Sequence, residues 1–136
     1  MQDHGPNPFV TDIEAATLGN GAFRSTLWTG THLQVTLMCL QPEEEIGLEM
    51  HQDVDQFLRV EEGAGLIEMG PARDDLSYRR EVSDDDAVLV PAGTWHNVVN
   101  TGATPLRLYS IYGPAEHAHG TVHLTKAEAD AAEHDH

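Results

Sequence analysis

Short strand-like segments, separated by turn residues, run along most of this chain and limit what it can fold into. They are residues 23–28, 33–40, 47–51, 57–60, 66–69, 78–82, 87–90, 97–99 and 106–112. Glycine, proline and acidic residues separate them, as in the Gly63–Gly65 turn and in residues 101–105. Many short strands divided by turns indicate an all-β sandwich or barrel.

The segment from Leu33 to Cys39 shows the strand alternation most clearly. Its odd-numbered residues are apolar, whereas Gln34 and Thr36 are polar. Successive side chains of a strand point to opposite faces, so this pattern predicts one apolar face and one polar face. Cys39 is the only cysteine, so no disulfide can form within the chain.

The length predicts a single domain, residues 1–136, with a core barrel at about 22–124. Residues 1–7 are expected to form a loose polar arm, and residues 9–18 a short turn or strand. A short peripheral helix is expected at 125–133. There Thr125 and Glu128 have capping-box spacing and an alanine-rich stretch follows.

The charge of the chain restricts its partners. It carries 23 acidic and 7 basic residues, a formal net charge of −16. Nucleic acids and anionic membranes attract basic surfaces, so we expect neither as a partner. No apolar run reaches the length of a membrane span, and the polar N-terminus is unlike a signal peptide. We therefore expect a cytoplasmic protein with a small-molecule ligand.

Two segments, residues 45–63 and 91–100, hold the side chains with the most distinctive chemistry. Glu49 and His51 lie two positions apart in the expected strand at 47–51, so their side chains should project from one face. Gln56 follows in the same segment, and His96 lies in the second. Carboxylate, imidazole and amide groups can all bind metal ions. The sequence thus predicts a metal site in a small barrel and leaves the substrate open.

The second segment resembles one of the two sequence motifs of the cupin superfamily. That motif runs glycine, five residues, Pro-x-Gly, two residues, histidine, three residues and asparagine. Here Pro91, Gly93, His96 and Asn100 fit it, and Asp85 stands where the leading glycine would be. Aspartate tolerates the left-handed backbone conformation better than most residues, so this departure is mild.

The first segment resembles the other cupin motif, with two departures. That motif has His-x-His, three or four residues, an acid, six residues and glycine. Counting back from Gly63 places Gln56 at the acid, His51 at the second histidine and Glu49 at the first. The single negative ligand charge is kept but has moved to the first position.

The resemblance implies a cupin jelly-roll β-barrel, also called a double-stranded β-helix, with a short C-terminal helix. It also implies one divalent metal ion. Carried over position by position, the ligands would be Glu49, His51, Gln56 and His96. Two imidazoles, one carboxylate and one amide suit Zn, Mn, Fe, Ni or Co, and the sequence does not choose among them.

The same residues also allow a second register, that is, a second assignment of the metal ligands. His51-x-Asp53 together with His96 resembles the facial triad of non-haem Fe(II) oxygenases. Arg107, eleven residues after His96, would then resemble the arginine with which 2-oxoglutarate oxygenases hold their cosubstrate. The short chain and the full Pro-x-Gly-x-x-His-x-x-x-Asn motif count against this register.

Within the cupins, this short form resembles small single-domain proteins labelled mannose-6-phosphate isomerase-like. That resemblance implies metal-assisted isomerisation of a sugar or sugar phosphate, in which a base moves a proton between carbons. An Fe(II)-dependent cupin dioxygenase and a non-enzymatic small-ligand binding or sensing cupin are the alternatives.

Acid–base candidates are Tyr109 and Tyr112, and substrate-binding candidates are Arg59 and Arg107. His117 and His119 form either a second site or an exposed loop. Small cupins usually pair their sheets, so we expect a homodimer.

Overall fold

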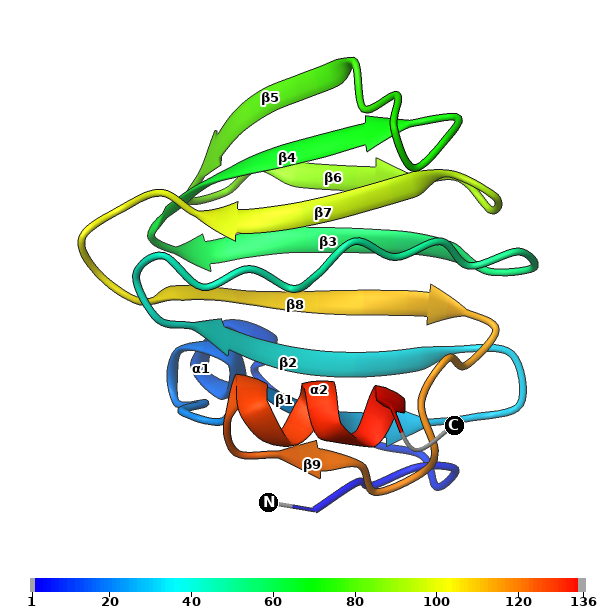
Figure 1. Cartoon of the computed structure of the whole chain (residues 1–136). Helices are drawn as coiled ribbons and strands as arrows, with labels where there is room; N and C mark the ends of the chain where they lie inside the picture. The colour runs from blue at the N-terminus through cyan, green and yellow to red at the C-terminus, as the bar shows by residue number, and fades with distance from the viewer. Residues whose placement is uncertain (1, 135–136) are drawn as a thin grey trace.

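Two antiparallel β-sheets face each other and enclose the core of the protein (Figure 1). The computed structural model describes residues 2–134. The strands are β1 Arg24–Thr29, β2 Gln34–Leu40, β3 Asp55–Glu62, β4 Ala64–Gly70, β5 Tyr78–Ser83, β6 Ala87–Val90, β7 Trp95–Asn100, β8 Leu106–Gly113 and β9 Val122–His123. The larger sheet has the order β6-β3-β8-β2-β1-β9, and the smaller has the order β5-β4-β7. The predicted all-β jelly-roll class is confirmed.

A short helix that the sequence analysis did not predict covers part of the outer face of the larger sheet. It is α1, Ile13–Leu18, and the side chain of Asp12 caps it by accepting the N–H of Ala15 at 3.0 Å. Ile13 packs against the outward residues Leu27 and Leu37. Residues 9–18 therefore contain a helix rather than a turn or strand, and six residues are too few for a clear helical period.

The expected C-terminal helix is α2, Lys126–His134, and it begins with the predicted capping box. The Thr125 hydroxyl accepts the N–H of Glu128 at 3.2 Å, and the Glu128 carboxylate accepts the N–H of Leu124 at 2.6 Å. Ala129 is 3% exposed and belongs to the main hydrophobic core. Ala129 therefore anchors the helix to the barrel.

The inward face of the larger sheet changes from apolar to polar along its strands. At one end the inward side chains belong to the apolar core; they are Met38, Leu40, Leu58, Val60, Leu106 and Leu108. At the other end they are polar and still buried; they are Gln34, Thr36, Gln56, Ser110 and Tyr112. Strand pairing joins Gln56 to Tyr112 and Tyr112 to Gln34, so these side chains form one row across three strands. The polar face of the 33–40 segment is thus the interior face.

The N-terminal segment is anchored to the barrel, which corrects the expectation of a loose arm. Asp3 is 8% exposed. Its carboxylate accepts hydrogen bonds from the Thr29 hydroxyl at 2.6 Å, the Gly5 N–H at 2.9 Å and the Gly120 N–H at 3.0 Å. Among the described residues, no helix has the length and apolar character needed to cross a membrane.

Candidate metal centre

Glu49 and His96 are brought face to face by the backbone. The Glu49 N–H donates to the His96 carbonyl at 3.0 Å, and the His96 N–H donates to the Glu49 carbonyl at 2.9 Å. This is a hydrogen-bonded antiparallel pair, but it is isolated, so the expected strand at 47–51 is wrong. Gly47 has φ of +110° and donates its N–H to the Asn97 side chain, which interrupts the ladder.

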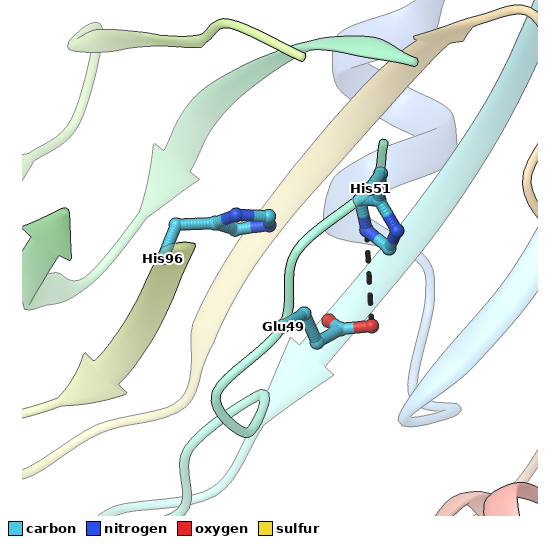
Figure 2. Close-up of side chains that lie close together, drawn as sticks. All are labelled: Glu49, His51 and His96. Carbon is cyan, nitrogen blue, oxygen red and sulfur yellow. Dashed lines mark ion pairs between the residues drawn. The ribbon is translucent and has the colours of Figure 1, made fainter. Parts of the chain in front are cut away.

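Three side chains converge at this bridge. Figure 2 shows Glu49 and His51 on the irregular segment and His96 on β7. Each offers one ligand atom, and these atoms all lie within 4.8 Å of one another. Nε2 of His51 is 3.8 Å from a carboxylate oxygen of Glu49, and the two imidazole centroids are 5.3 Å apart. Both histidines are less than 9% exposed.

The hydrogen bonds of the two imidazoles leave the same ring nitrogen facing the group. Nδ1 of His96 is 3.0 Å from the Thr94 carbonyl, and Nδ1 of His51 is 3.1 Å from the Glu116 carboxylate. Both partners can only accept, so each Nδ1 carries the proton. Both Nε2 atoms are buried, and neither has a hydrogen-bond partner within residues 2–134. Buried polar atoms are rarely left so, and the arrangement is that of metal-binding histidines oriented by outer partners.

The two imidazoles have opposite electrostatic environments. Burial alone would lower the pKa of His51, but the Glu116 hydrogen bond and the charges of Glu49 and Glu116 outweigh burial and raise it. Burial lowers the pKa of His96 and outweighs the hydrogen bond to the Thr94 carbonyl and the charge of Glu116, which both raise it. His96 is therefore neutral at neutral pH, whereas the protonated form of His51 persists to higher pH.

Gln56 lies in the same polar interior, on β3. Its Nε2 donates to the Ser110 hydroxyl at 3.3 Å, and its Oε1 is buried without a hydrogen-bond partner among the described residues. It pairs with Tyr112, whose ring centroid lies 5.9 Å from that of His51. A free amide oxygen in this position suits a fourth ligand, which stays a prediction. Asp53 is exposed and lies outside the converging group, so the structure favours Glu49 over the alternative register.

Glu116 and Gln34 hold the site together and were not singled out in the sequence. Gln34, fully buried on β2, accepts the N–H groups of Glu116 and His117 at 3.0 and 2.9 Å. Its amide also donates to the His117 carbonyl at 2.7 Å. These bonds fix the loop after β8 and aim the Glu116 carboxylate at His51. The buried polar residue in an alternating strand was the signal that could have identified Gln34.

Of the two tyrosine candidates, the structure brings only Tyr112 to the site. Its ring contacts those of His51 and His117, with centroids 5.9 and 5.4 Å away. Burial raises the pKa of Tyr112 far above its ordinary value, so the phenol stays protonated. Burial also lowers the pKa of His117 to about 3, so that ring is neutral. Tyr109 faces outward and packs with Leu37.

The arginines proposed for substrate binding lie elsewhere. Arg59 and Arg107 occupy outward positions on β3 and β8, because the inward positions of both strands carry the opposite parity. Arg59 pairs with Glu61 at 2.9 Å, and Arg107 pairs with Glu62 at 2.6 Å. His119 is largely exposed and lies 3.4 Å from the Asp3 carboxylate. Neither arginine is brought to the Glu49–His51–His96 group.

Two opposed antiparallel sheets around a buried carboxylate and two imidazoles with free Nε2 atoms define a small β-barrel of the metal-binding type. More particularly, the chain belongs to the cupin domain family, whose model matches residues 36–112. The matched region contains Glu49, His51 and His96 together with Gln56.

Similar proteins are known from distant sources. The uncharacterized protein YrkC of Bacillus subtilis (strain 168) is 60% identical over 133 residues, which is 98% of this chain and 72% of that protein. The uncharacterized protein L612 of Acanthamoeba polyphaga mimivirus is 34% identical over 122 residues, 89% of this chain and 74% of that protein. The crystal structure of BH2720 from Bacillus halodurans is 63% identical and superposes with a TM-score of 0.95, covering 96% of this chain and 99% of that one.

Proposed function

We propose that this chain is a metal-dependent cupin that acts on a small polar metabolite by isomerase-like chemistry, with sugars and sugar phosphates as the first substrates to test. The observation that carries the proposal is the convergence of Glu49, His51 and His96 within 4.8 Å, with both Nε2 atoms buried and without hydrogen-bond partners in the described chain. Such a mixed nitrogen and oxygen donor set suits a divalent transition metal.

The residues around the group fit the binding of an oxygenated ligand through hydrogen bonds. A divalent metal supplies a Lewis acid when bound. Tyr112 keeps its proton at neutral pH and can donate a hydrogen bond to a ligand oxygen. His117 is neutral beside it and can accept a hydrogen bond. Glu116 and Thr94 hold the two imidazoles in one tautomer, which keeps both Nε2 atoms available.

The metal content of protein purified without a His tag tests the site. Glu49→Ala should lose most of the bound metal, because the only carboxylate of the group is removed. Asp53→Ala is the matched control, since it removes the same charge from an exposed position nearby. Metal retained by Glu49→Ala and lost by Asp53→Ala would replace this ligand set with His51, Asp53 and His96.

The reaction class is tested on the metal-loaded protein. Interconversion of an aldose and a ketose, or of their phosphates, followed by NMR, is the expected result. Oxygen consumption by the Fe(II)-loaded protein would instead make it a dioxygenase. Ligand-induced thermal stabilisation without turnover would make it a binding or sensing cupin.

The homodimer also stays a proposal, and the outer face of the larger sheet supports it. Strand pairing places Leu89, Phe57, Ile111 and Val35 in one apolar row across four strands. Leu89 is 68% exposed, so this row offers apolar surface that a second copy would cover. Sedimentation showing a monomer at micromolar concentration would reject the dimer.

A further inference from the structure

The N-terminal segment is joined to the metal group by a line of hydrogen bonds. The Thr29 hydroxyl on β1 donates to the Asp3 carboxylate at 2.6 Å. The same hydroxyl oxygen accepts an N–H of the Gln34 amide on β2 at 3.0 Å. Gln34 in turn accepts the N–H of Glu116 at 3.0 Å, and the Glu116 carboxylate lies 3.1 Å from Nδ1 of His51. Asp3, Thr29, Gln34 and Glu116 thus form a relay that ends at His51.

The charge of Asp3 fixes the direction of the hydrogen bonds from Thr29 to the loop after β8. Burial would raise the pKa of Asp3, but the hydrogen bonds to its carboxylate outweigh burial and lower the pKa to about 2, so this group only accepts. The Thr29 hydroxyl therefore donates to Asp3 and accepts from Gln34. The second N–H of Gln34 donates to the His117 carbonyl, and its oxygen accepts two backbone N–H groups of the loop. These bonds use the whole hydrogen-bonding capacity of the amide, so a change at Thr29 also disturbs the loop.

Asp3 holds the same loop at a second point. The Gly120 N–H donates to the Asp3 carboxylate at 3.0 Å, and Nε2 of His119 lies 2.7 Å from the Gly5 carbonyl. Asp3 is 8% exposed and Gln34 is fully buried, so water has little access to replace these bonds. The loop is therefore held by Gln34 near its middle and by the N-terminal segment at its end, and its position depends on both.

We propose that Asp3 is a positioning residue for the metal group, although it lies outside the converging Glu49, His51 and His96. It acts through the relay, which holds Glu116 against His51. A partner that orients a metal-binding imidazole raises its affinity for the ion, and buried hydrogen bonds in a chain strengthen one another. The inference rests on the proposed metal site and makes its affinity depend on the N-terminal segment.

Substitutions at Thr29 break or keep the relay at its centre. Thr29→Val keeps the β-branched shape that suits a strand but removes the hydroxyl, whereas Thr29→Ser keeps the hydroxyl. Asp3 retains its bonds from Gly5 and Gly120 in both variants. Chelator competition on the full chain measures the affinity for Zn²⁺, and the visible spectrum of the Co²⁺-loaded protein reports the coordination. Asp12→Ala is the control for stability, since it removes a carboxylate that caps α1 and is no member of the relay.

Thr29→Val should weaken metal binding by about three- to tenfold, less than the loss of Glu116 itself, because Thr29 acts further from the metal ligand. It should also change the Co²⁺ spectrum. Thr29→Ser and Asp12→Ala should bind metal as the wild type does. In a protein that already carries Glu116→Ala, adding Thr29→Val should cause no further loss of affinity, since both changes act through the same carboxylate.

Equal metal affinity in Thr29→Val and the wild type would overturn the positioning role and leave the metal site standing. The role would also fail if Thr29→Val lowered the affinity equally with and without Glu116, or if Asp12→Ala shared the loss, which would then reflect stability alone. If Thr29→Val does not fold, Asp3→Asn, which keeps the shape of its side chain, gives the same comparisons. A wild type that binds no metal would refute the proposed function itself.

Discussion

Replacing Asp3 by asparagine should cost a predictable amount of stability. Burial alone would raise the pKa of the Asp3 carboxyl, but hydrogen bonds from Thr29, Gly120 and Gly5 outweigh it and lower the pKa from 3.8 to about 2. At roughly 1.4 kcal/mol for each pKa unit, the folded state gains about 2 kcal/mol from the ionised carboxylate at neutral pH. Asp3→Asn keeps the shape but turns one acceptor into a donor, which faces the Thr29 hydroxyl and the Gly120 N–H.

The sign of the pH dependence follows from the lowered pKa. The stabilisation is fully present above the unfolded-state pKa and is lost as the pH falls through the folded-state value of about 2. Urea unfolding at pH 7 should therefore give Asp3→Asn a free energy of unfolding about 2 kcal/mol below the wild type, and roughly half that difference should remain at pH 3. Equal stabilities at pH 7, or a difference that does not shrink at pH 3, would refute the reasoning.

Two predictions concern the metal group directly. Glu116→Ala should lower metal affinity roughly 10- to 100-fold, because His51 loses the partner that orients it, while Glu116→Gln, which can still accept from Nδ1, should lose less. Chelator competition measures the metal affinity of both variants. An unchanged affinity in Glu116→Ala would show that Glu116 does not position His51. Gln56→Glu should enlarge the metal-induced rise in melting temperature, since two close carboxylates, the new one and Glu49, repel without metal and are neutralised with it. An equal rise in wild type and Gln56→Glu would place Gln56 away from the metal.

The sequence motifs predicted that Glu49, His51 and His96 come together, even though one supporting element was wrong. Residues 47–51 do not form a strand, yet Glu49 and His51 still converge with His96. The motif spacing encodes the position of this segment beside β7, where two isolated backbone bridges hold it, Glu45 with Val99 and Glu49 with His96. A two-residue alternation rule predicts only that side chains share a face, which an irregular segment can also achieve.

Residues far apart in the chain that support the site could not be found from local patterns. Glu116 reaches His51 only because β8 returns beside β3 and because Gln34, on a third strand, binds the following loop. Arg59 and Arg107 lie near the motifs in the sequence, but strand parity turns both side chains outward. Sequence proximity was misleading because, in a barrel, the direction of a side chain depends on its parity along the strand.

The alternation of inward and outward positions along a strand also explains why polar residues at inward positions are the best guide to function. A side chain at an inward position is buried whatever its chemistry, so a polar residue there costs stability unless it has partners. Gln34 has them: it is bound to the loop after β8 and, through the Thr29 hydroxyl, to Asp3. The Nε2 atoms of His51 and His96 are also buried but have no hydrogen-bond partner among the described residues. Buried polar groups with partners, such as Gln34, therefore position the site, whereas the buried Nε2 atoms without partners are where we expect a metal ion to bind.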